Sequence, residues 1–191
     1  MSFDRPHASL LLRIRLPSPD LCVAVLTGML SFFVSAAHAN EVYLTPENFV
    51  KQAFAGETPK PETIWITGAL RAKVEAVLAH KTQVLRIRYW RQKRRTAWVL
   101  EEMGKEKNIT VGIIVDQEKI ELLKTLIYRE SRGWEVREDF FTRQFIGRFL
   151  TDASQLDAPI DSISGATLSV QSVTKLGRLA LLLDQTIQGQ P

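Results

Sequence analysis

The chain has 191 residues, 45% of them hydrophobic, which suits one domain with a buried core plus an extension. Four Trp and nine Phe argue against intrinsic disorder. The formal net charge of +4 is compatible with an anionic partner, but a charge of this size does not identify one.

The N-terminal segment has the three parts of a secretion signal. It begins with a basic stretch and continues with an apolar run at residues 21–34, which is too short for a comfortable membrane span. Ala37 and Ala39 then supply the small-x-small pattern that precedes a cleavage site. We therefore expect residues 1–39 to be a signal peptide and the protein to be periplasmic. An N-terminal anchor is the alternative if the signal is not cleaved.

Cleavage after Ala39 removes the single cysteine of the chain. Cys22 is the only cysteine, so the mature chain has no disulfide, no thiol nucleophile and no thiolate metal ligand. Of the three histidines only His80 remains. We therefore expect no metal site and no catalytic triad. His80 is expected at the C-terminal end of a helix, as a capping cation.

Residues 40–82 are expected to form a helical extension. A helix is predicted over 45–55, because it opens with Thr as the N-cap, Pro at the first helical position and an acid in the first turn. The segment 58–62 contains two prolines and is interpreted as a connector. A second helix is predicted over 69–80, where apolar residues recur along one side.

Residues 83–191 are expected to be the functional domain. Alternating and β-branched runs predict an antiparallel meander of four strands with local turns, at residues 84–90, 96–102, 109–115 and 120–128. The segment 135–149 mixes aromatic and charged residues without a clean period. A long amphipathic helix is predicted over 167–187. Helices that flank a meander sheet define an α+β fold.

The segment Asp161-Ser-Ile-Ser-Gly-Ala-Thr167 lies immediately before the long helix. Its small residues allow a ligand to approach the backbone, and a helix N-terminus offers unpaired N–H groups and a partial positive charge. Ser164, Thr167 and Ser169 add hydroxyl groups. These features predict a phosphate-binding site. The residues alone also fit an ordinary helix start in which Ser164 or Thr167 is the cap.

The same segment resembles the flavin-attachment motif of the FMN-binding domain family, Asp-x-x-Ser-Gly-Ala-Thr. That family includes the C subunit of the sodium-pumping NADH:quinone reductase and the G subunit of the Rnf complex. The resemblance implies that FMN is bonded covalently to Thr167 through a phosphoester, after transfer from FAD by a dedicated flavin transferase. Because threonine is a weak nucleophile, the activation comes from the transferase. The recognition positions that the resemblance implies are Asp161, Ser164, Gly165 and Ala166.

Two further elements resemble the same family. Residues 130–134 are similar to a Glu-Thr-x-Gly loop that packs close to the isoalloxazine ring, and residues 141–147 are similar to a Phe-x-x-Gln-Phe-x-Gly element. In the first element Ser131 replaces the usual Thr, and Trp134 replaces the usual aliphatic residue. The Phe residues are expected mostly in the core. The resemblance covers about residues 96–183, and it extends the expected cofactor-binding set by Ser169, Glu130, Ser131, Gly133 and Trp134.

Residues 91–95 are a basic run, which we expect at the tip of a hairpin. Nucleic-acid binding is one interpretation of such a run, but export argues against it. We expect a solvated tip, and docking onto an acidic redox partner or an anionic lipid is the alternative.

These expectations describe a periplasmic flavoprotein with covalent FMN that exchanges electrons with a membrane or periplasmic redox partner protein. No general base, nucleophile or substrate pocket can be identified in the sequence. We therefore expect an electron carrier rather than a self-sufficient enzyme. The alternatives are an FMN-dependent reductase of a small extracytoplasmic substrate, and a non-redox module that binds another phosphorylated ligand.

Overall fold

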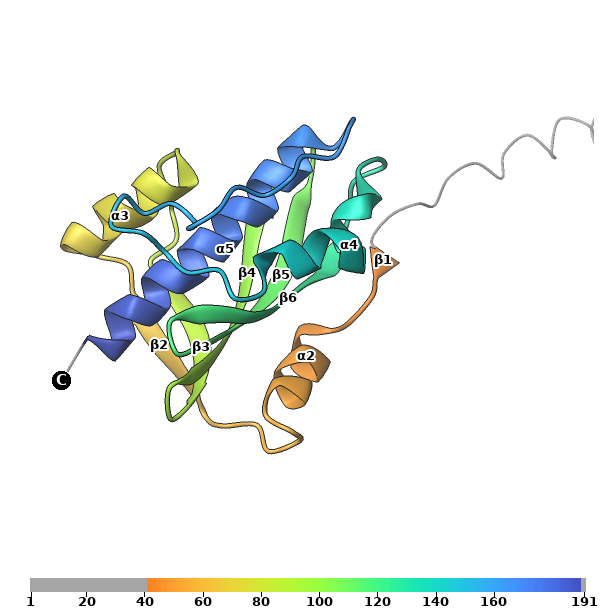
Figure 1. The fold of residues 1–191 in the computed structure, drawn as a ribbon. Helices are drawn as coiled ribbons and strands as arrows, with labels where there is room; N and C mark the ends of the chain where they lie inside the picture. Colours follow the sequence, from red (N-terminus) through yellow and green to blue (C-terminus); the bar gives the residue numbers. More distant parts are fainter. Residues whose placement is uncertain (1–40, 190–191) are drawn as a thin grey trace, which may run out of the picture. The chain divides into compact units, whose positions relative to one another are not determined.

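The computed structural model describes residues 41–189, which form an antiparallel sheet with helices on both of its faces (Figure 1). The expected signal peptide at 1–39 lies outside the described residues. Within the described part, no helix has the length and hydropathy needed to span a bilayer. The α+β class predicted from the sequence is confirmed.

The sheet has six strands in the order β1-β6-β5-β4-β3-β2, and every neighbouring pair is antiparallel. The four central strands follow one another along the chain, so the predicted meander is confirmed. The strands are β1 (Glu41–Val42), β2 (Pro61–Trp65), β3 (Arg86–Gln92), β4 (Arg95–Met103), β5 (Asn108–Asp116) and β6 (Lys119–Tyr128).

The predicted helices are also present. α2 (Pro46–Ala53) and α3 (Gly68–Leu78) lie in the N-terminal region, and α5 (Thr167–Gln188) is the long C-terminal helix. The segment without a clear period contains three short helices: η1 (Trp134–Arg137), α4 (Asp139–Thr142) and η2 (Arg143–Phe145).

Two local expectations were wrong. Residues 58–62 are not only a connector, because β2 begins at Pro61 and pairs with β3. Proline is tolerated there because it is the first residue of an outermost strand. The basic hairpin tip is also shorter than expected. Only Lys93 and Arg94 form the turn, and the rest of the 91–95 run belongs to β3 and β4.

The sheet separates two hydrophobic cores. The larger core packs α3, α5 and the short helices against one face, and the smaller core packs α2 against the other. β5 is therefore covered on both faces, which explains its unbroken apolar run. Gly112 in β5 permits the close approach of α2, since a Cβ there would lie 2.7 Å from the Phe49 ring.

Candidate functional site

The N-terminus of α5 is open to a ligand. Thr167 is its first residue and is exposed, and the preceding residue, Ala166, makes no side-chain cap. The first turn contains no acidic side chain. The first N–H groups of a 22-residue helix therefore have no capping carboxylate or hydroxyl, and their partial positive charge favours an anion.

The backbone before Thr167 is equally accessible. Gly165 has a φ of +80°, and a Cβ built on it would have no atom within 4 Å. Asp161 and Ser164 are exposed, whereas Ala166 is buried. A bulky group can thus approach the motif from solvent at Gly165. The exposed threonine, the uncapped helix and this open backbone fit a phosphate-bearing cofactor.

The loop at 130–134 packs directly against the start of α5. Gly133 has a φ of +81°, and a Cβ there would lie 2.9 Å from the Tyr128 hydroxyl, 3.1 Å from Ala166 Cβ and 3.2 Å from Ser169 Oγ. Only glycine fits this contact. The structure thus brings together two sequence elements that are more than thirty residues apart.

Tyr128 connects the same two elements by hydrogen bonds. Its hydroxyl donates to the Arg132 carbonyl and lies 3.0 Å from Ser169 Oγ. Burial raises the pKa of Tyr128, so the phenol remains protonated at neutral pH. Ser169 is 4% exposed. In this structure, the Ser169 hydroxyl therefore contacts Tyr128, which in turn holds the 130–134 loop through the Arg132 carbonyl.

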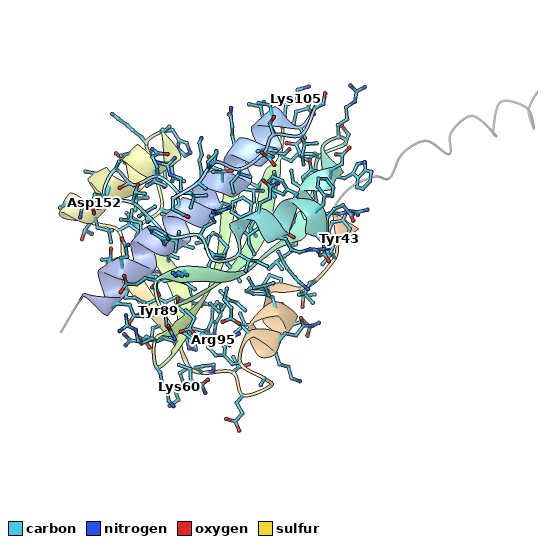
Figure 2. The ribbon with its side chains drawn as sticks, in the orientation of Figure 1. Tyr43, Lys60, Tyr89, Arg95, Lys105 and Asp152 are labelled. Carbon is cyan, nitrogen blue, oxygen red and sulfur yellow. The ribbon has the colours of Figure 1, made fainter. Side chains whose placement is uncertain are left out.

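Glu130 binds the turn between β4 and β5. Its Oε1 atom accepts hydrogen bonds from the backbone N–H groups of Glu106 at 2.7 Å and Lys107 at 3.0 Å. Lys105 in this turn lies at the end of the sheet where α5 begins (Figure 2). Ser131, the next residue in the loop, is exposed.

Trp134 is the exposed aromatic residue of this loop, with 47% of its surface accessible. The Arg137 guanidinium lies 5.0 Å from the centre of its ring and 4.4 Å from that of Tyr43, which Figure 2 labels. The cation thus connects η1 to the residue that follows β1.

The third sequence element, residues 141–147, binds the first residue of the motif and packs into the core. Gln144 accepts a hydrogen bond from the Asp161 backbone N–H at 2.7 Å. Phe141 and Phe145 are fully buried and meet edge to face at 5.5 Å. These two confirm the expectation that the Phe residues lie in the core, but Phe140 is 60% exposed.

A cavity of about 350 Å³ opens beside Thr167. Ile160 and Ser162 supply one wall, and α5 supplies the other through Thr167, Val170, Gln171, Thr174, Lys175 and Arg178. Sequence reasoning did not find Gln171, Lys175 or Arg178, although their spacing from Thr167 places them on one helix face. A larger cavity of about 830 Å³ is lined mostly by residues of α3, β3, β4 and the segment 80–84, and none of its lining residues belongs to the motif.

Three of the four basic residues of the 91–95 run are paired with glutamates. Arg91 contacts Glu62 at 3.1 Å, Arg94 contacts Glu118 at 3.1 Å and Arg95 contacts Glu121 at 2.8 Å. These are surface ion pairs of small individual strength. The local positive charge is therefore largely balanced.

His80 lies after α3 and contacts two acceptors. Its Nδ1 is 3.0 Å from the Lys81 carbonyl, and its Nε2 is 2.8 Å from Glu102 Oε1. The backbone hydrogen bond and then Glu102 raise the pKa of His80. Among the described residues, no group of three or more His, Cys, Asp or Glu side chains could hold a metal ion.

The antiparallel sheet, the long helix on one face and the open end of that helix define an α+β domain with a site for a phosphate-bearing ligand. Residues 104–181 match the family model described as the FMN-binding domain. The chain therefore contains an FMN-binding domain, which supports FMN as its cofactor. The matched segment contains all three sequence elements that meet at the start of α5. Comparison with curated proteins gave no significant match.

Proposed function

We propose that the protein carries FMN covalently on Thr167 and works as an electron-transfer component outside the cytoplasm. The observation that carries this proposal is the exposed Thr167 hydroxyl at the uncapped start of α5, inside an FMN-binding domain. The cofactor phosphate would lie among the N–H groups of the first helical turn, where the helix dipole favours its charge.

The attachment step transfers the FMN part of FAD together with its phosphate. Thr167 Oγ forms a bond to the FMN-side phosphorus of FAD, the pyrophosphate bond breaks, and AMP leaves while the hydroxyl proton is released. A threonine hydroxyl is not acidic enough to attack unaided. The proposal therefore includes a flavin transferase as a partner that activates the hydroxyl.

FMN supplies one- and two-electron redox chemistry when it is bound. The chain's own residues would fix its position. Gly133 and Tyr128 hold the 130–134 loop against α5, and Gln144 holds the backbone of Asp161. Trp134 beside this site offers an exposed aromatic contact for a membrane or periplasmic redox partner. These are the functions of a carrier that holds and exposes a cofactor.

The experiment is a mass measurement on protein purified from an exporting host that contains a flavin transferase. We expect a mature chain that begins near residue 40 and carries the added mass of FMN minus water. Thr167→Ala removes this mass, while Thr45→Ala keeps it, because Thr45 caps α2 and lies outside the motif. An unmodified mature chain from such a host overturns covalent attachment, and retention in the cytoplasm overturns the proposed location.

A further inference from the structure

The ladder between β3 and β4 covers only part of the two strands. It runs from Gln92↔Arg95 at the hairpin as far as Tyr89↔Trp98. Beyond that pair, residues 86–88 of β3 pair with β2, and residues 99–103 of β4 pair with β5, but the described strands do not pair with each other. Both unpaired stretches line the cavity of about 830 Å³. The sheet therefore has an opening between β3 and β4.

Backbone groups at this opening have no partner strand. The Leu85 carbonyl accepts a hydrogen bond from the Ile66 N–H at 2.9 Å, so it points toward β2. Because the backbone groups of successive residues in a strand point to opposite edges, those of Arg86 point toward β4. The hairpin register would place Glu101 opposite Arg86, but no ladder joins these two residues in the described part of the chain. Each strand thus presents an open edge to the cavity.

The two faces of the opening differ in chemistry. Arg86 and Arg88 alternate along β3 with Ile87, which packs against the larger core, so the two arginines point to the α2 face. On the opposite face, the lining includes the buried side chains of Ile66 and Val74. A strand placed in the opening would direct alternate side chains to these two faces. It would need charged residues at one set of positions and apolar residues at the other.

Arg86 and Arg88 supply positive charge that is not balanced locally. Both side chains are exposed, and neither forms an ion pair with a described residue. Arg86 lies 6.0 Å from the centre of the Trp65 ring, which leaves its charge in place. Acidic side chains on a neighbouring strand would pair with these two cations.

The acids that line the cavity are mostly paired already. Glu101 contacts Arg129 at 3.5 Å, and Glu102 contacts His80 at 2.8 Å. Glu47 is the remaining acid of the lining and has no ion pair in the described part of the chain. Two unpaired arginines against one unpaired glutamate leave a positive balance, which favours an acidic ligand.

We propose that the opening between β3 and β4 binds an extended peptide segment of a partner protein, in which acidic and apolar residues alternate. The segment adds a strand along the open edge of β4. Its acidic side chains lie beside Arg86 and Arg88, and its apolar side chains enter the cavity on the opposite face of the sheet.

The length of the open edge limits the length of the segment. The Met103 carbonyl already accepts a hydrogen bond from Ser172 Oγ, so the open edge of β4 consists of residues 99–102. Four residues of a strand span roughly 13 Å. Asn108 and Leu179 are the only lining residues inside the segment that matches the FMN-binding domain. The peptide site therefore belongs mainly to the preceding part of the chain and does not depend on flavin attachment.

The test is an NMR titration of the flavinylated mature protein, labelled with ¹⁵N. The probe is a synthetic, capped Glu-Val-Glu-Val-Glu peptide, and we expect the largest changes in chemical shift at the backbone amides of Arg86 and Glu101. Two matched peptides separate the contributions. Glu-Glu-Val-Val-Glu has the same composition without alternation, and the fully N-methylated probe donates no backbone hydrogen bond. Both should bind at least about tenfold more weakly.

Arg86→Met combined with Arg88→Met should weaken binding of the probe by about tenfold, because two cross-strand charge pairs are lost. Lys119→Met combined with Lys124→Met is the matched control, since it removes the same charge from exposed positions of β6 outside the cavity. The control should keep the affinity of the natural chain.

Three outcomes overturn the proposal. The first is unchanged affinity in the arginine double variant with an intact thermal transition. The second is equal binding of the alternating peptide and either matched peptide. In the third, decanoate shifts the amides of Arg86 and Glu101 while the probe peptide does not, which makes the opening a site for a small amphipathic anion instead.

Discussion

The starts of α2 and α5 contain the same residue type in different roles. Thr45 precedes α2 and accepts a hydrogen bond from the Asn48 N–H at 3.2 Å, and Glu47 lies in the first turn. Thr167 is inside α5 as its first residue, and its first turn has neither a side-chain cap nor an acid. Thr45 thus stands one position before its helix and caps it, whereas Thr167 is the first residue of its helix and is exposed at an uncapped end.

The two helix starts are also stabilised differently. α2 begins with a local cap and a proline at the first helical position. α5 begins against a separate loop, because Gly133 contacts Ala166 and Ser169, and Tyr128 contacts Ser169. Long-range packing at α5 substitutes for capping and leaves its N–H groups open. Such an arrangement is expected where a ligand, rather than a side chain, completes the helix.

The largest expected difference between the helix starts concerns the cofactor. Thr167→Ala removes the covalent FMN completely, because the acceptor oxygen is lost. In the apo protein it changes the free energy of unfolding little, because Thr167 makes no cap. Thr45→Ala keeps the full adduct but lowers the free energy of unfolding by about 1 kcal/mol, since the N-cap hydrogen bond is lost. Intact mass and urea denaturation measure the two effects.

These two variants form a reciprocal control. Loss of the adduct in Thr45→Ala at unchanged stability contradicts the assignment of Thr45 as a purely structural residue. A stability loss of the same size in Thr167→Ala contradicts the conclusion that α5 is uncapped.

The next effect tests the loop that holds α5. Gly133→Ala should lower the free energy of unfolding by about 2–4 kcal/mol, because it adds a left-handed-backbone cost to overpacking against Ala166 and Ser169. Gly68→Ala is the control, since Gly68 also has a positive φ but a Cβ there has no neighbour within 4 Å. The control should lose only about 1 kcal/mol. If urea denaturation shows that both variants lose the same free energy of unfolding, the contact between the 130–134 loop and α5 contributes nothing to stability.

The sequence predicted those parts of the site that depend on local pattern. The start of α5 at Thr167 followed from a strong helical period and a compact motif, and Phe141 and Phe145 were correctly expected in the core. β2 was missed because Pro61 and the preceding Pro59 resemble the prolines of a connector, and because its burial depends on pairing with β3. Local propensity does not report such pairing.

The missed site residues depend on tertiary contacts. The spacing of Lys175 and Arg178 placed them on the Thr167 face, but the cavity beside Thr167 exists only because Ile160 and Ser162 form its other wall. The contact between Tyr128 and Ser169 joins residues 41 positions apart. No periodicity within either segment specifies the distance between them.

The two helices also differ in where they carry negative charge. Glu47 in α2 is exposed, whereas Asp184 in α5 is fully buried. Asp184 Oδ1 accepts from Thr96 Oγ1 at 2.7 Å, and its Oδ2 has no hydrogen-bond partner among the described residues. Burial raises the pKa of Asp184 above its ordinary value of 3.8. The folded state therefore favours the protonated, neutral acid.

The smallest predicted effect follows from this burial. The stability that protonated Asp184 contributes is present below pH 3.8 and is lost as the pH rises through the raised pKa. Asp184→Asn stays neutral, so it should gain stability relative to the natural chain between pH 4 and pH 7, by on the order of 1 kcal/mol. Urea denaturation at both pH values measures this gain. If the difference in the free energy of unfolding between Asp184→Asn and the natural chain is the same at pH 4 and at pH 7, the prediction is contradicted. Asp184 then has the same proton affinity in the folded and unfolded states.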